Sequence, residues 1–149
     1  MQELATRAPA FRTVEEIEEL VDAFESCALP RAQWNHAAHL TVAVWYLTHH
    51  GEPKATQRMR AAIQKYNRAQ GISMSESGGY HETLTLFYMR VLHRYLGRLK
   101  SGGSTVEAAN QVVIRFSSRR YPLNFYSKEL LMSVKARAEW VEPDLKPLD

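Results

Sequence analysis

Apolar residues recur at every third or fourth position along most of this chain, which is the spacing of one face of an α-helix. In one stretch the apolar positions are Val14, Ile17, Val21 and Phe24, with charged residues between them. The pattern returns further along and predicts five helices, over about 14–27, 35–50, 53–70, 80–100 and from 104 onward. It is strongest over 80–100.

Residues that prefer helix ends stand at the borders of these stretches. Two capping boxes, at 13–16 and 104–107, pair a hydroxyl residue with a later glutamate. Asn35 is a favoured N-cap residue. Ser127 is expected to cap a last helical stretch that breaks near Ser133. The helix starts are therefore predicted from local chemistry as well as from periodicity.

Together these elements predict an all-α fold, an up-down bundle of four to five helices with a short C-terminal helix and an extended tail. The 149 residues are expected to form a single helical domain, 1–149. Segments 1–12 and 141–149 are expected to be extended or poorly ordered. In such a bundle the second and fourth helices run parallel, so their starts lie at the same end.

Histidines stand at both of these helix starts. His36 and His39 share one face of the second helix, and His81 and Glu82 open the fourth. Their convergence predicts a site for one divalent transition metal (Zn, Fe, Ni, Cu or Mn) held by His36, His39, His81 and Glu82. Glu82 is either the fourth ligand or the catalytic base. Without a metal, His81 and Glu82 would act as an acid and base or form hydrogen bonds in the core.

Cationic and aromatic side chains are expected around the same end of the bundle. Arg120 continues the inner line of the fifth helix, so it is expected to hold an acidic group of a substrate, with Arg119 and Tyr126 beside it. Tyr46 and Tyr88 lie among core positions and are candidates to line a cavity below the metal.

Composition narrows the classes of function. The formal charge of +3 comes from arginines and lysines interleaved with acids, so nucleic-acid binding is only weakly indicated. No apolar run has the length of a membrane span, and no membrane partner is expected. The N-terminus lacks a secretory signal, so a cytoplasmic location is expected. Cys27 is the only cysteine, which excludes a thiolate cluster, and it is expected to be a small buried side chain.

Several short motifs support a resemblance. They are Trp-x-His-x-x-His-Leu at 34–40, Gly-Tyr-His-Glu-Thr-x-Thr at 79–85, Tyr-Ser at 126–127, Ala-Arg at 136–137 and Glu-Pro-Asp-Leu at 142–145. With these motifs the chain resembles a family of small bacterial proteins that has no established activity. The resemblance spans about residues 30–146, and it implies that His36, His39, His81 and Glu82 form a shared polar core.

The leading hypothesis is a metal-dependent enzyme that acts on a small, acidic metabolite and is gated by the polar loop at 71–79. A zinc ion would suit hydrolytic or lyase chemistry, and iron would suit an oxygenase. The alternative is a non-enzymatic regulatory protein that binds a metal or small ligand. A homodimer is considered as a further partner under either hypothesis. Nonspecific nucleic-acid binding is the weakest hypothesis.

Overall fold

Helices form wherever the apolar periodicity predicts them. A computed structural model describes residues 11–99 and 103–148, and within these ranges the chain contains helices and no strand. The elements are α2 (Val14–Glu25), η1 (Arg31–Gln33), α3 (His36–His49), α4 (Glu52–Ala69), α5 (Glu82–Arg98), α6 (Thr105–Arg115), η2 (Tyr121–Asn124), α7 (Lys128–Leu131) and α8 (Val134–Ala138). The predicted all-α fold is confirmed.

The predicted caps hold the helix starts. Thr13 and Ser104 each form a complete capping box. The Asn35 side chain accepts a hydrogen bond from the backbone N–H of Ala38 at the start of α3. Serines cap both α7 and α8, so the predicted break of the last helical stretch is also present. Local hydrogen bonding therefore sets most of the helix starts.

Two details differ from the prediction. α2 ends at Glu25, and Cys27 beyond it adopts a φ of 66°, so this cysteine is a half-buried residue of the turn and does not belong to the buried helical face. α5 begins at Glu82, and His81 is its N-cap. His81 takes this place because its extended backbone lets the ring accept the N–H of Leu84. This second difference decides what His81 can do.

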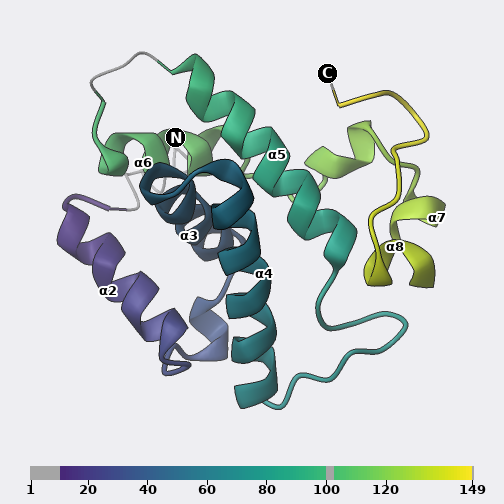
Figure 1. Cartoon of the computed structure of the whole chain (residues 1–149), viewed down its shortest axis with the longest axis horizontal. Coiled ribbons are helices and arrows are strands. Elements are labelled where there is room, and N and C mark those ends of the chain that lie inside the picture. Colours follow the sequence, from purple (N-terminus) through teal and green to yellow (C-terminus); the bar gives the residue numbers. More distant parts are fainter. Residues whose placement is uncertain (1–10, 100–102, 149) are drawn as a thin grey trace, which may run out of the picture.

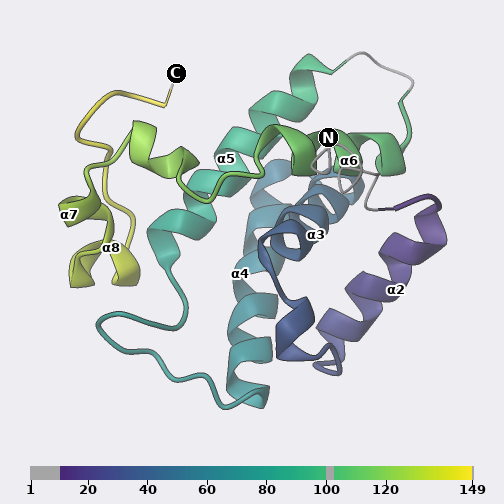
Figure 2. The same ribbon diagram turned by 180° about the vertical axis from the view of Figure 1, so that it is seen from behind.

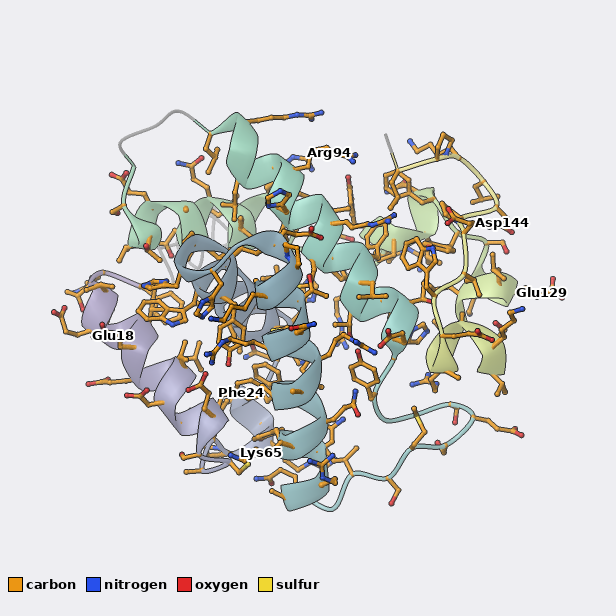
Figure 3. All side chains as sticks on the ribbon, in the orientation of Figure 1. Glu18, Phe24, Lys65, Arg94, Glu129 and Asp144 are labelled. Carbon is orange, nitrogen blue, oxygen red and sulfur yellow. The ribbon has the colours of Figure 1, made fainter. Side chains whose placement is uncertain are left out.

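α3 is the central helix of the bundle. It contacts α2, α4, α5 and α6, and Figures 1 and 2 show it enclosed by these helices. Its residues from Leu40 to Val44 are all buried, which removes the polar face that the outer helices keep. On α2, by contrast, Figure 3 shows Phe24 directed into the bundle and Glu18 directed away from it. α3 is therefore packed on several sides by the other helices.

A second, smaller core joins the C-terminal segment to α5. Figure 1 shows α7, α8 and the yellow tail on the side of α5 that faces away from α2. Phe87 of α5 packs there against Phe125, Tyr126 and Leu131. The Thr83 hydroxyl donates to the carbonyl of Glu139. This segment thus supports the first turn of α5 from outside the main bundle.

The tail at 141–148 contains no helix, as expected, and it is tied to the fold. The Asp144 carboxylate accepts the N–H of Ser127 at 2.7 Å, and the N–H of Leu145 donates to the carbonyl of Phe125 at 2.9 Å. The predicted extended segment at 1–12 falls mainly outside the described residues. No helix in the described ranges has both the length and the apolar character that crossing a membrane requires.

Candidate ligand-binding cavity

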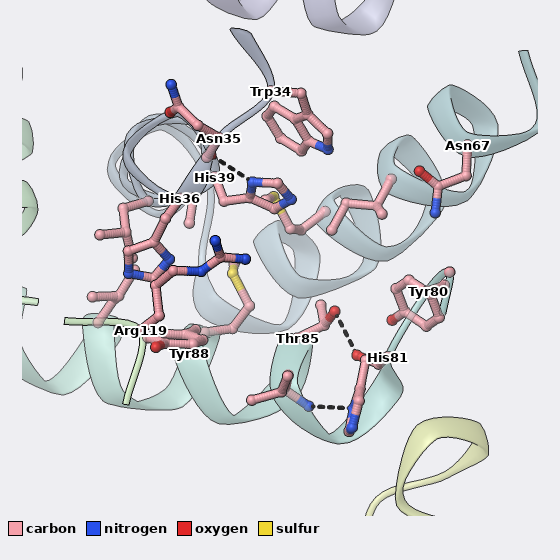
Figure 4. A pocket seen from close by; sticks show the side chains of 18 of the residues that line it. Trp34, Asn35, His36, His39, Asn67, Tyr80, His81, Thr85, Tyr88 and Arg119 are labelled. Carbon is pink, nitrogen blue, oxygen red and sulfur yellow. Dashed lines mark hydrogen bonds between the residues drawn. The ribbon is translucent and has the colours of Figure 1, made fainter. Parts of the chain in front are cut away.

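A cavity of about 540 Å³ lies between the starts of α3 and α5, the inner face of α4 and the loop that leads into α5 (Figure 4). This volume is in the range of pockets that take small organic ligands. Most of its wall is apolar and comes from three helices: Leu40, Ala43, Met59, Ile63, Leu84, Met89 and Leu92. Polar side chains stand at both ends of this apolar wall.

The cavity brings together some of the side chains that the sequence predicted for the site. Five of the predicted residues line it: His36, His39, His81, Tyr88 and Arg119. Four others are not among its lining residues: Glu82, Arg120, Tyr46 and Tyr126. The starts of α3 and α5 therefore meet as the up-down arrangement requires, but with a different set of polar groups.

Both ring nitrogens of His81 are occupied by the fold. Nδ1 accepts the N–H of Leu84 at 3.1 Å, so the proton must reside on Nε2. Nε2 in turn donates to the carbonyl of Leu131 at 2.8 Å. Burial, the main cause, lowers the pKa of His81. A neutral imidazole in this tautomer has no lone pair left for a metal, so His81 acts as a helix cap and a link to α7.

Glu82 is also fully used by neighbouring side chains. Its Oε1 accepts a hydrogen bond from Nε of Arg60 on α4 at 3.1 Å, and its Oε2 forms an ion pair with Nη2 of the same arginine at 3.0 Å. The Tyr80 hydroxyl donates to Oε1 at 2.6 Å. A buried carboxylate is stable in such a setting because it is paired and hydrogen-bonded. Glu82 therefore joins α4 to α5, and its oxygens do not face the cavity.

The predicted four-ligand metal site is accordingly not assembled. Among the described residues, no group of three or more His, Cys, Asp or Glu side chains is placed to hold a metal ion. The physical reason lies in the two residues at the start of α5. The lone pair of His81 accepts the N–H of Leu84, and Glu82 is paired with Arg60. His36 and His39 remain as the nitrogen donors of the original set.

His39 lines the cavity with one unprotonated ring nitrogen that has no hydrogen-bond partner among the described residues. Its Nδ1 lies 2.7 Å from the carbonyl of Asn35, so Nδ1 carries the proton and Nε2 keeps its lone pair. The ring stacks on Trp34 with centroids 3.8 Å apart, and Trp34 stacks on Phe24 at 4.0 Å. Burial, with small contributions from His36 and Arg119, lowers the pKa of His39 to about 4. His39 is therefore a neutral, firmly held hydrogen-bond acceptor at neutral pH.

His36 is fixed in the opposite tautomer. Its Nε2 lies 2.9 Å from the carbonyl of Phe116 at the end of α6, so Nε2 carries the proton. Nδ1 keeps a lone pair and forms no hydrogen bond with the described residues. The ring also meets Tyr88 edge-on, with centroids 5.7 Å apart. The two histidines of α3 thus each retain one uncommitted nitrogen.

Arg119 and Tyr88 complete this end of the cavity. Neither side chain forms a hydrogen bond or ion pair with the described residues. Burial raises the pKa of Tyr88, while the positive charge of Arg119 acts against this rise. The described residues that line the cavity include no aspartate or glutamate. Arg119 is an exposed residue at this end of the cavity, and no carboxylate of the described wall neutralises its charge.

The remaining predicted substrate contacts have structural roles or face solvent. The Tyr46 hydroxyl donates to the Glu25 carboxylate, and burial raises its pKa. Tyr126 belongs to the C-terminal core, where its hydroxyl donates to the carbonyl of Val141 and burial raises its pKa to about 12. Arg119 and Arg120 are both exposed, but only Arg119 lines the cavity. Arg119, and not Arg120, is thus the arginine at this site.

Asn67 and Tyr80 line the cavity but were not predicted as site residues. Asn67 follows Met59 and Ile63 at successive intervals of four on α4, so it continues their face toward the cavity. This change from apolar to polar residues along one helical face could have indicated Asn67 as a site residue. Tyr80 had no comparable signal, because its position depends on the course of the loop before α5.

Comparison with protein-family models, curated proteins and solved structures gives no match for this chain.

Proposed function

We propose that this protein binds a small organic anion in the cavity between α3, α4 and α5. The observation that carries the proposal is the charge of the wall, which has an unpaired guanidinium at Arg119 and no carboxylate among its described residues. A carboxylate is the natural partner for such a guanidinium. The first turn of α3, with its positive dipole end, lies beside the same part of the cavity.

The neutral groups around Arg119 suit the rest of an acidic ligand. His39 Nε2 accepts a hydrogen bond, and the Tyr88 hydroxyl can donate one. The apolar wall beyond them favours a hydrocarbon body over a highly polar one. The lowered pKa of His39, about 4, makes it a weak base, which favours binding of the ligand over proton abstraction from it. The class that fits best is therefore a ligand-binding protein.

The experiment is a binding series with small acids and their neutral amides. Isothermal titration with 3-phenylpropanoate and 3-phenylpropanamide should show binding of the acid alone. Arg119→Met should weaken binding of the acid by about ten- to hundredfold, because a hydrogen bond to a charged group contributes about 1.5–3 kcal/mol. Arg120→Met removes a neighbouring charge that is also exposed but does not line the cavity, and it should leave binding of the acid unchanged.

Equal binding of acid and amide, or equal affinity in Arg119→Met and the wild type, would refute anion binding at Arg119. No binding of any of a set of aliphatic and aromatic carboxylates would do the same. Circular dichroism of each variant shows whether a loss of binding comes from a loss of fold.

A metal-dependent enzyme is the second candidate, and the two histidines of α3 favour it. His36 Nδ1 and His39 Nε2 each keep a lone pair and line the same cavity. The test is elemental analysis of protein purified without a His tag or chelator, beside His36→Ala, His39→Ala and the exposed control His93→Ala. Metal near one equivalent, lost in the first two variants alone, would support this function. No metal after loading with Zn, Fe(II), Ni, Cu and Mn would remove it.

A further inference from the structure

The end of the cavity away from Arg119 also contains a polar side chain without a partner. Figure 4 shows Asn67 and Arg119 on opposite sides of the cavity, with His39 between them. The backbone carbonyl of Asn67 accepts the N–H of Ile72, but its side-chain amide forms no hydrogen bond with the described residues. The side chain is half-buried and lines the cavity. It therefore keeps a donor and an acceptor at this end.

Three other polar side chains that line the cavity already have hydrogen-bond partners. The Tyr80 hydroxyl donates to Glu82, and the Thr85 hydroxyl donates to the carbonyl of His81. Both nitrogens of His81 have partners as well. Of these four side chains, Asn67 is thus the one whose hydrogen-bonding groups remain unused.

The wall between the two ends is apolar. Met59 and Ile63 come from α4, and Met89 comes from α5. Burial of hydrocarbon against an apolar wall is favourable, but it does not discriminate between ligands of similar size. Selection requires polar groups at fixed positions, and these stand at the two ends.

We propose that Asn67 forms a second polar subsite, so that the ligand is an apolar acid with a hydroxyl or carbonyl group at the end opposite its carboxylate. A side-chain amide both donates and accepts, so it pairs with a neutral group of either kind. A distal ammonium group is disfavoured, since the described cavity wall offers no carboxylate to pair with it. This inference rests on the proposed binding of the acid group by Arg119.

The test uses matched acids that differ in one distal hydroxyl. Benzoate, phenylacetate and 3-phenylpropanoate are compared with their 4-hydroxy derivatives by isothermal titration, so that the distance between the two polar groups varies. The wild type should bind at least one hydroxylated acid about three- to tenfold more tightly than its parent, which is the usual net effect of one hydrogen bond. Asn67→Leu should abolish this preference and retain binding of the parent acid.

Gln57→Leu, an exposed change on the same helix, is the matched control and should keep the preference. Asn67→Ala, which adds no bulk to the cavity, guards against a steric effect of leucine. No preference in any pair, or a preference that survives in both Asn67 variants, would overturn the subsite. If both kinds of acid bind and depend on Arg119 but not on Asn67, only this inference fails. If binding does not depend on Arg119, the proposed function fails.

Discussion

His81→Ala is predicted to destabilise the fold, and the structure gives the reason. The substitution removes the ring that accepts the N–H of Leu84 and caps α5. It also removes the donor to the carbonyl of Leu131, which connects α5 to the C-terminal segment. His81 is buried, so water does not readily replace either partner. The effect should therefore appear in stability whether or not a ligand is present.

The two lost interactions set the size of the effect. Loss of an N-cap costs about 1 kcal/mol. Loss of a hydrogen bond that leaves a buried acceptor unsatisfied costs about 1–3 kcal/mol. The free energy of unfolding should thus fall by about 2–4 kcal/mol. His81→Asn can keep the cap and loses only the contact with Leu131, so it should lose less stability than the alanine variant.

Urea denaturation followed by circular dichroism measures these differences, with the exposed substitution His93→Ala as the control. The control should stay within about 0.5 kcal/mol of the wild type. Equal stability of His81→Ala and His93→Ala would refute the structural role of His81. Equal losses in His81→Ala and His81→Asn would show that the cap contributes nothing.

Two further outcomes test the cavity. The His39 ring should titrate near pH 4 when followed by NMR. The lowered pKa contributes about 3 kcal/mol to the free energy of unfolding above pH 6.5, and this contribution should be lost as the pH falls toward 4. The variant His39→Phe should not show this loss. Gly79→Ala should lower thermal stability and the affinity for 3-phenylpropanoate, because Gly79 has a φ of 87° and a new Cβ would lie 2.8 Å from the carbonyl of Ser73. Gly78→Ala, whose Cβ would meet the Ser75 hydroxyl at 3.4 Å, should change either quantity less. A normal His39 titration near pH 6.5, or equal effects of the two glycine variants, would contradict these assignments.

The candidate site shows how far sequence reasoning reached. The parallel arrangement of two helix starts was predictable, and His36, His39 and His81 do line one cavity. Which nitrogen and oxygen atoms of the predicted site residues would remain without a hydrogen-bond partner was not predictable. Nothing near His81 in the sequence indicates that the Leu131 carbonyl will accept its hydrogen bond, and nothing near Glu82 indicates that it will pair with Arg60 on another helix.

The all-α class, the helix positions and most of the N-caps could be predicted from the amino-acid sequence, because apolar spacing and N-cap hydrogen bonds act within a few residues. Tertiary structure alone decided that α3 is the buried centre, that His81 and Glu82 serve the fold, and that Arg119 lines the cavity in place of Arg120. These outcomes depend on which distant groups packing brings into contact. A buried polar atom takes the partner that lies nearest in space, and that partner is set by the assembled fold.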